Sequence, residues 1–201
     1  MELMGKVKFI LASASPRRRE ILDAVGIKYE VRPTEADETI PDDCANDAEK
    51  TVCMLSKRKA DAASHGGSNE IIIAADTVVF AGGEILGKPT DVIDAARMLK
   101  TLSGKTHSVL TGITVKRGEK TVTEFEKSFV TFLPLTDEQI HTYIKLKNPL
   151  DKAGAYGIQE TAALFVSEIK GDYHNIVGLP ICRLGEILRR EFAVELVCEI
   201  E

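Results

Sequence analysis

The residues best suited to bind an anion lie near the start of the chain, where a serine and a proline precede two arginines. Ser15 is a favourable N-cap residue, and Pro16 suits the first helical position because its missing N–H would be unpaired there. Arg17 and Arg18 would then stand in the first turn, where the helix dipole repels cations. A bound polyanion would account for this, since helix N-termini and guanidinium groups both bind phosphate. The alternative is a solvated basic helix start.

A single carboxylate, Asp76, follows the uninterrupted apolar run Ile71–Ala75. Burying a carboxylate alone is costly, so it must be paired or must hold a metal. Ligands and catalytic residues of open α/β sheets gather at the carboxyl ends of strands. We therefore expect Asp76 to act either as a general base for water or as a ligand of Mg²⁺. A structural aspartate that caps a turn is the alternative.

Two lysines could neutralise phosphate charge beside this carboxylate. Lys88 stands between Gly87 and Pro89, and the proline biases Lys88 toward an extended backbone. A lysine held in this way could offset the charge of a transition state. Lys59 falls on the inward side of a predicted helix, where a snorkelling lysine is an equally good interpretation.

A loop rich in small residues, 151–159, could admit a flat ligand. Its last residue, Gln159, carries an amide that offers both a donor and an acceptor to the edge of a pyrimidine base. A second loop, 171–180, leads into the last predicted helix and contains His174, which we interpret as a surface or capping residue. The other three histidines, His65, His107 and His141, have no mutual spacing that indicates a metal site.

These residues lie among alternating strand and helix signals, which predict an α/β fold and one domain over residues 1–201. Predicted strands are Val7–Ala12, Lys28–Arg32, Ile71–Ala75, a hairpin of Thr106–Val115 with Thr121–Leu133, Leu164–Ile169 and a closing strand Val194–Val197. Predicted helices are Arg17–Val25, Ala48–Ala63, Asp91–Leu102 capped by Thr90 or Asp91, one opened by Thr136 with a capping box, and Leu179–Glu191. Residues 35–47 and 64–68 are predicted loops.

Composition narrows the classes of partner. The 201 residues carry a formal net charge of −5, so there is no global basic field for nucleic acid, and an anionic ligand must meet a local cluster of cations. The four cysteines form no CxxC pair and are expected to be free thiols. Lys8 interrupts the apolar start of the chain, and no stretch approaches the ~20 apolar residues of a membrane span. We expect a cytoplasmic protein that does not bind membranes.

Taken together, these segments resemble the Maf family of nucleotide pyrophosphatases, also called septum formation inhibitor Maf proteins. The resemblance covers residues 11–188, with its motifs in family order. They are Ser13-Ala14-Ser15-Pro16-Arg17-Arg18, Lys59-Ala60, Ala75-Asp76-Thr77, Gly87-Lys88-Pro89, Leu102-Ser103-Gly104, Asp151-Lys152-Ala153-Gly154 and Gly178-Leu179-Pro180. The family implies a central mixed sheet flanked by helices, with a cleft between two lobes, similar to inosine triphosphate pyrophosphatases. Family members often dimerise, so a homodimer is one expected state.

The resemblance also implies roles for particular residues. The segment 156–159 looks like the branch that acts on dTTP and UTP, rather than the branch that acts on 7-methyl-GTP. Two departures from the family pattern are Glu160, where a glycine is common, and Ser56, where an alanine is usual. The implied catalytic residues are Asp76 and Lys88, the implied metal ligands for Mg²⁺ or Mn²⁺ are Asp76 and Glu38, and the implied substrate-binding residues are Ser13, Ser15, Arg17, Arg18, Glu38, Lys59, Thr77 and Gln159.

The expected reaction is hydrolysis of a nucleoside triphosphate to the monophosphate and pyrophosphate, with cations holding the phosphates and Asp76 activating water. Two alternatives stay open. A nucleotidyltransferase would need an acceptor site and would give no net hydrolysis without an acceptor. A non-enzymatic regulator of cell division, as the family's name suggests, would keep its function after loss of Asp76.

Overall fold

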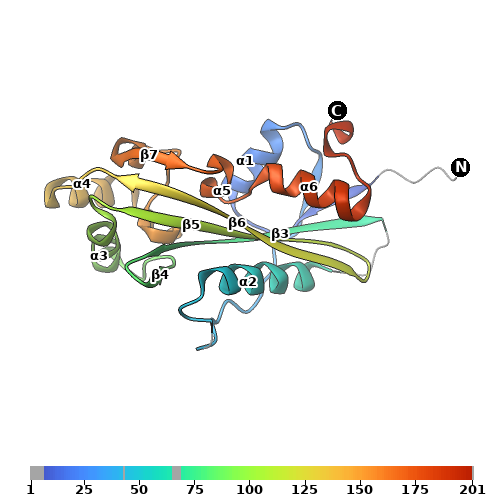
Figure 1. Ribbon diagram of the computed structural model, residues 1–201, viewed down its shortest axis with the longest axis horizontal. Coiled ribbons are helices and arrows are strands. Elements are labelled where there is room, and N and C mark those ends of the chain that lie inside the picture. The colour runs from blue at the N-terminus through green and yellow to red at the C-terminus, as the bar shows by residue number, and fades with distance from the viewer. Residues whose placement is uncertain (1–6, 43, 65–68, 201) are drawn as a thin grey trace, which may run out of the picture.

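The computed structural model describes residues 7–42, 44–64 and 69–200, and these residues form a mixed seven-stranded sheet (Figure 1). The strand order is β2-β1-β3-β5-β6-β7, and β4 pairs with β3 outside this path. Among these described strands, β1 pairs in parallel with both β2 and β3, and the remaining pairs are antiparallel. The strands are β1 (Lys8–Leu11), β2 (Tyr29–Val31), β3 (Glu70–Ala81), β4 (Glu84–Leu86), β5 (Thr106–Arg117), β6 (Lys120–Phe132) and β7 (Val166–Lys170).

Helices cover both faces of this sheet. In Figure 1, α2 lies below the long strands, α1, α5 and α6 lie above them, and α3 and α4 sit together at one end. None of the described helices is both long enough and apolar enough to cross a membrane. The α-helices are α1 (Pro16–Ala24), α2 (Ala48–Ala63), α3 (Val92–Leu102), α4 (Asp137–Lys147), α5 (Tyr173–Val177) and α6 (Ile181–Phe192), and the 3₁₀ helices are η1 (Pro149–Asp151), η2 (Ala153–Ala155), η3 (Thr161–Phe165) and η4 (Leu196–Glu199).

Strand β3 is buried on both faces, as its apolar run predicts. Its side chains alternate, so Ile71 and Ile73 join the large core beneath α1 and α6, while Ile72 and Ala74 join a smaller core beneath α2. The same alternation sends the next two polar residues of the strand to opposite faces. This places a carboxylate under α2 and a hydroxyl under α1.

Helix α2 lies unusually close to the sheet at Gly112 of β5. A Cβ atom at this position would collide with the backbone of Val52 on α2, so only glycine allows the approach. The contact sets the distance between α2 and the sheet. Lys59 follows Val52 by seven residues, about two helical turns, and therefore lies on the same face of the helix.

Most predicted elements are confirmed, including the two capping predictions. The side chain of Asp91 accepts hydrogen bonds from the backbone N–H groups of Ile93 and Asp94, both at 2.8 Å. Thr136 and Gln139 form the predicted capping box at the start of α4. The strand predicted over residues 71–75 is longer than expected, since β3 continues to Ala81.

The closing strand predicted at Val194–Val197 is wrong. Residues 196–199 form η4 instead, because Ala193 adopts a left-handed conformation (φ 54°) that turns the chain after α6. The only strand-like contact of this segment among the described residues is a single bridge between Ile27 and Ile200. Alternating apolar residues predict a strand, but a strand also has to pair along a neighbour, and residues 194–197 pair with none of the described strands.

Three smaller corrections concern local structure. The predicted loop 171–180 contains the short helix α5, which Asp172 caps and Gly178 (φ 122°) ends. The strand predicted from Leu164 begins only at Val166, after η3. Strand β4 was not predicted, although the Gly82-Gly83 pair before it is a hairpin signal. Of the predicted loop 64–68, residues 65–68, with His65, lie outside the described residues.

Candidate active site

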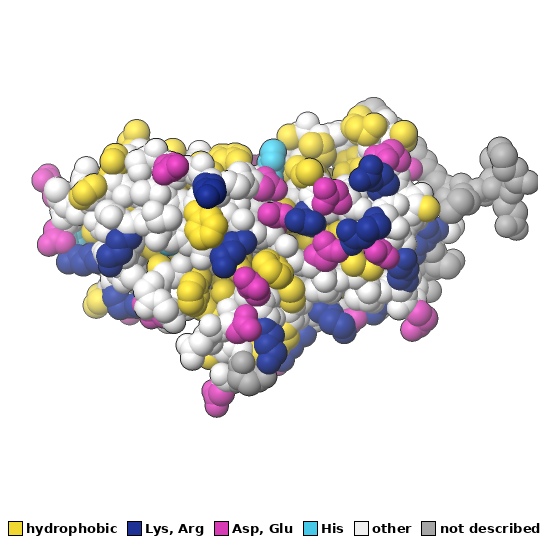
Figure 2. Space-filling view, viewed as in Figure 1, with side chains coloured by type: hydrophobic (Ala, Val, Ile, Leu, Met, Phe, Trp, Pro, Cys, Tyr) yellow, Lys and Arg dark blue, Asp and Glu magenta, His cyan; other side chains and the backbone are white. Residues whose placement is uncertain are grey.

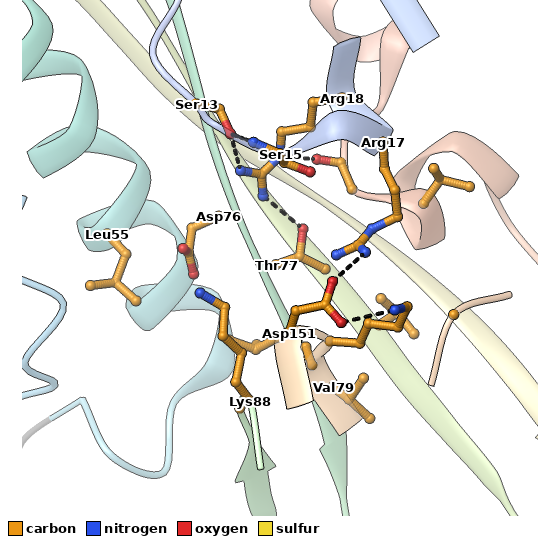
Figure 3. Close-up of a pocket in the computed structure, with 18 of the residues that line it drawn as sticks. Ser13, Ser15, Arg17, Arg18, Leu55, Asp76, Thr77, Val79, Lys88 and Asp151 are labelled. Carbon is orange, nitrogen blue, oxygen red and sulfur yellow. Dashed lines mark hydrogen bonds and ion pairs between the residues drawn. The ribbon is translucent and has the colours of Figure 1, made fainter. Parts of the chain in front are cut away.

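A cavity of about 840 Å³ opens where β1 ends and the longer β3 continues. Strand β1 pairs with β3 only as far as Leu11 and Ile73, after which the chain leaves the sheet for α1. The next residues of β3 therefore have no neighbour on that side, and the cavity forms there (Figure 3). All ten site residues predicted from the sequence line it, namely Ser13, Ser15, Arg17, Arg18, Glu38, Lys59, Asp76, Thr77, Lys88 and Gln159.

Two carboxylates converge on one lysine at the α2 side of the cavity. The ammonium group of Lys59 lies 2.5 Å from Oδ1 of Asp76 and 2.8 Å from Oε1 of Glu38. The hydrogen bond from Lys59 holds the pKa of Glu38 below its usual value, although burial acts in the opposite direction. Asp76 comes from β3 and Lys59 from α2, but Glu38 comes from an irregular loop. The alternative in which Lys59 only snorkels to solvent is therefore wrong.

Arg18 is held in the cavity by neutral groups alone. Its guanidinium donates to the carbonyl oxygen of Gly178 (2.8 Å), to Oγ of Ser13 (3.0 Å) and to Oγ1 of Thr77 (3.3 Å). Burial lowers the pKa of Arg18. Within the part of the chain that the structure describes, no carboxylate lies within ion-pair distance of this guanidinium. Arg18 is thus a partly desolvated positive charge without a bound counter-charge.

Two arginines on the outer surface are ion-paired instead. Arg183 on α6 pairs with Glu126 of β6 at 2.9 Å, and Arg97 on α3 pairs with Glu84 and Asp94, both at 2.9 Å. Figure 2 shows cationic and anionic side chains interspersed over α6 and the neighbouring β6. A partly desolvated guanidinium that is bonded only to neutral groups, as in Arg18, is what is expected of a group that binds an anion.

The start of α1 adds backbone donors to this positive region. Ser15 is the N-cap residue by position and Pro16 is the first helical residue, as predicted. The side chain of Ser15 makes no capping hydrogen bond, while its N–H donates to Oγ of Ser13 at 3.2 Å. The first-turn N–H groups of α1 are therefore left for a ligand.

Lys88 approaches the carboxylate of Asp76 from the far side of the cavity. Its side chain is exposed and points toward Asp76 (Figure 3). It makes no hydrogen bond or ion pair with any residue that the structure describes, so its charge is available to a ligand. The neighbouring carbonyl oxygen of Gly87 accepts from the N–H of Gly154 at 3.0 Å, which ties this segment to the loop 151–159.

At the mouth of the cavity, the predicted site residue Arg17 joins a chain of charges whose other members were not predicted as site residues. Arg17 donates to Asp151 at 3.2 Å, Asp151 accepts from Lys152 at 2.8 Å, and Lys152 lies 3.5 Å from Glu160. Burial raises the pKa of Asp151, but the hydrogen bonds from Lys152 and Arg17 outweigh it and the net shift is downward. The adjacent acidic and basic residues that begin the small-residue loop, Asp151 and Lys152, were the sequence signal that could have identified these contacts. Glu160, which departs from the family pattern, is thus paired with a buried lysine.

The same loop is anchored from below by aromatic residues. The N–H of Gly157 donates to the hydroxyl of Tyr143 at 3.3 Å, and the hydroxyl of Tyr156 lies 2.9 Å from Nε2 of His107. Burial lowers the pKa of His107 to about 4, so this ring is neutral at physiological pH. Gln159 follows as an exposed residue at the cavity edge. These anchors fix where its amide is presented.

Metal and thiol chemistry have few candidates among the described residues. No group of three or more histidine, cysteine, aspartate or glutamate side chains comes together there. The two carboxylates that meet at Lys59, Asp76 and Glu38, are the pair predicted as metal ligands. The four cysteines all lie among the described residues and form no disulfide there, as predicted. Ser56, the second departure from the family pattern, is buried and hydrogen-bonds to Thr114 at 2.9 Å, away from the cavity.

The chain is similar in sequence to known proteins. The family model described as Maf-like protein matches residues 8–191. The chain belongs to the Maf-like protein family. Among curated relatives, it is 48% identical to a dTTP/UTP pyrophosphatase of Bacillus cytotoxicus over 183 residues, which is 91% of this chain and 95% of the relative. The dTTP/UTP pyrophosphatases of Bacillus mycoides and Bacillus cereus are 45% and 46% identical over the same shares of both chains.

Solved structures that are similar to this Maf-like chain include two Ham1 proteins. The Staphylococcus aureus protein has a TM-score of 0.45 and 12% identity, with 62% of this chain and 71% of that chain covered. The Coxiella burnetii protein has a TM-score of 0.39 and 11% identity, with 63% and 73% covered. The α/β class itself rests on the observed sheet and its flanking helices.

Proposed function

We propose that this protein hydrolyses dTTP and UTP to the nucleoside monophosphate and pyrophosphate. The observation that carries the proposal is the partly desolvated guanidinium of Arg18, bound only to neutral groups a short distance from a carboxylate–lysine pair. A triphosphate would supply the missing negative charge. Relatives that are 45–48% identical carry the name dTTP/UTP pyrophosphatase, which supports the choice of substrate.

The positively charged groups that would bind the phosphates lie in two places. Arg18 and the N-terminus of α1 lie on one side of β3, while Lys59 and Lys88 lie beside Asp76. Together they surround the phosphate chain with fixed donors, which lower the free energy of the transition state by offsetting its charge. Gln159 at the cavity edge would contact the base, where its amide matches the donors and acceptors of a pyrimidine.

Asp76 is the proposed general base. It accepts a proton from a water molecule whose oxygen forms a bond to the α-phosphorus. The bond from that phosphorus to the bridging oxygen breaks, and its electron pair leaves with pyrophosphate. Lys59, whose ammonium group lies 2.5 Å from Oδ1 of Asp76, orients this carboxylate.

The residues present fit a divalent cation. Asp76 and Glu38 both direct a carboxylate oxygen toward one positive group, and an all-oxygen donor set suits Mg²⁺ or Mn²⁺ held jointly with substrate phosphates. A cation there would neutralise phosphate oxygens and promote ionisation of water. Asp76 and Glu38 are the residues that would hold it.

Pyrophosphate release from a panel of nucleotides tests the proposal. The panel contains dTTP, UTP, CTP, 7-methyl-GTP and ITP, each with Mg²⁺ and with a chelator. We expect metal-dependent turnover that is strongest on dTTP and UTP. Asp76→Asn should abolish turnover and leave nucleotide binding largely intact, because it removes the base and keeps the shape. Absence of turnover on every nucleotide would refute the proposal, and turnover led by another nucleotide would refute its specificity.

A further inference from the structure

The loop that carries Glu38 has no secondary structure of its own to hold it in place. Between β2 and the turn that precedes α2, the chain runs through residues 32–41 without a helix or strand. The side chain of Glu38 is 55% exposed, yet its carboxylate meets Lys59 at 2.8 Å. One ion pair at this exposure contributes little free energy. Another contact must keep the loop against α2.

That contact is Arg58, the residue before Lys59 on α2. One nitrogen of its guanidinium, Nη1, donates to the carbonyl oxygen of Asp37 at 3.1 Å and to that of Thr39 at 2.7 Å. These carbonyls flank Glu38 on both sides. The carboxylate of Asp37 also lies 3.7 Å from Nη1 and accepts from the N–H of Thr39 at 2.9 Å, which closes a turn around Glu38.

We propose that Arg58 is a positioning residue that clamps the backbone on both sides of Glu38 and so directs its carboxylate into the active site. The inference rests on the proposed function, because Glu38 matters only if the cavity binds phosphates or a cation. Arg58 does not line the cavity, so it acts through Glu38 and not on the substrate. Two successive residues of α2 thus hold Glu38. Arg58 binds the backbone carbonyls on either side of it, and Lys59 binds its carboxylate.

The chemistry of arginine suits this task. A planar guanidinium presents several N–H donors in a fixed fork, whereas a lysine ammonium carries its donors on a flexible stem. Because residues that orient metal or phosphate ligands typically matter by about 10- to 100-fold, Arg58→Met should lower kcat/KM for dTTP by roughly that factor. Arg58→Lys keeps a cation and a donor and should recover part of the loss.

A double-mutant cycle with Glu38→Gln tests the inference. The variants are Arg58→Met, Glu38→Gln and the pair of substitutions together. Lys57→Met serves as the matched control, because Lys57 is the preceding residue on α2 and pairs with Asp61 away from the loop. Two readouts are kcat/KM for dTTP and the Kd of α,β-imido-dUTP with Mn²⁺, measured by calorimetry. Thermal unfolding of each variant verifies that it is folded.

If Arg58 acts through Glu38, the double variant is no worse than Glu38→Gln alone, within about twofold, in both readouts. The control should match the wild type. The inference is overturned if Arg58→Met leaves both readouts unchanged, if the two single effects multiply, or if Glu38→Gln itself has no effect. Wild-type turnover on the nucleotide panel decides the proposed function separately. Should turnover be absent, the Kd values still decide the role of Arg58.

Discussion

Arg18→Met separates stability from ligand binding in one substitution. The guanidinium of Arg18 is partly desolvated and bonded only to neutral acceptors, so its removal takes away a charge that destabilises the empty cavity. Two of its three acceptors keep other partners, since Ser13 still accepts from Ser15 and Thr77 still meets Thr111. The costs and gains nearly cancel, and we expect the free energy of unfolding to change by less than about 2 kcal/mol.

Binding of pyrophosphate, in contrast, should change strongly. At 100 times its Kd, a ligand that binds only the folded state stabilises it by about 2.7 kcal/mol. For a chain of this size, about 2–4 °C per kcal/mol gives a rise in Tm of roughly 5–11 °C for the wild type. Loss of the charge-assisted bonds that Arg18 would make should cost about 1.5–3 kcal/mol each, which removes most of this rise at the same pyrophosphate concentration.

The assay is thermal unfolding with and without pyrophosphate and Mg²⁺. Arg97→Met is the matched control, because Arg97 is ion-paired to Glu84 and Asp94 outside the cavity. The control should keep the full pyrophosphate-induced rise in Tm. If Arg18→Met also keeps it, the cavity does not bind phosphate through Arg18, and the reasoning from its missing counter-charge is refuted.

Three further predictions follow from other contacts. Asp151→Asn weakens the contacts with Arg17 (3.2 Å) and with the buried Lys152 (2.8 Å), so it should lower the free energy of unfolding by about 1–3 kcal/mol and alter the ratio of kcat/KM for dTTP over CTP; an unchanged ratio would exclude Asp151 from specificity. Gly112→Ala forces a methyl group into the backbone of α2 and should cost at least about 2 kcal/mol in urea unfolding, so a wild-type midpoint would contradict the packing. The pKa of Glu38 is lowered in the folded protein, so its contribution to stability is present above the ordinary value of 4.5 and is lost as the pH falls through the lower, folded-state pKa. Glu38→Gln should therefore flatten the decline of stability below pH 4.5, measured by urea unfolding across that range. An unaltered decline would count against the interaction of Glu38 with Lys59.

The cavity also shows why a local rule is broken at the start of α1. Cations in the first turn of a helix oppose its dipole, and Arg18 lies where burial disfavours its charge. Both effects destabilise the free protein, and both become favourable when a polyanion binds. Such an arrangement is expected of residues that bind phosphate groups.

The sequence alone determined most of the elements and the types of chemical group in the site. The apolar run at Ile71–Ala75 predicted the central strand, and helical spacing predicted α2 with its observed bounds. Ser15, Pro16 and the two arginines predicted an anion site at a helix start, because capping and the helix dipole act within one turn. These signals are local, so they can be read along the chain.

Only the tertiary structure decided which groups meet. The contact of Lys59 with Asp76 depends on the close approach of α2 at Gly112, and the contact of Arg17 with Asp151 joins residues 134 positions apart. The closing strand predicted at Val194–Val197 also failed, since the chain turns at Ala193 after α6 and residues 196–199 form η4. Periodicity specifies which face of an element is buried, but the partner of that face is set by packing between segments distant in the sequence.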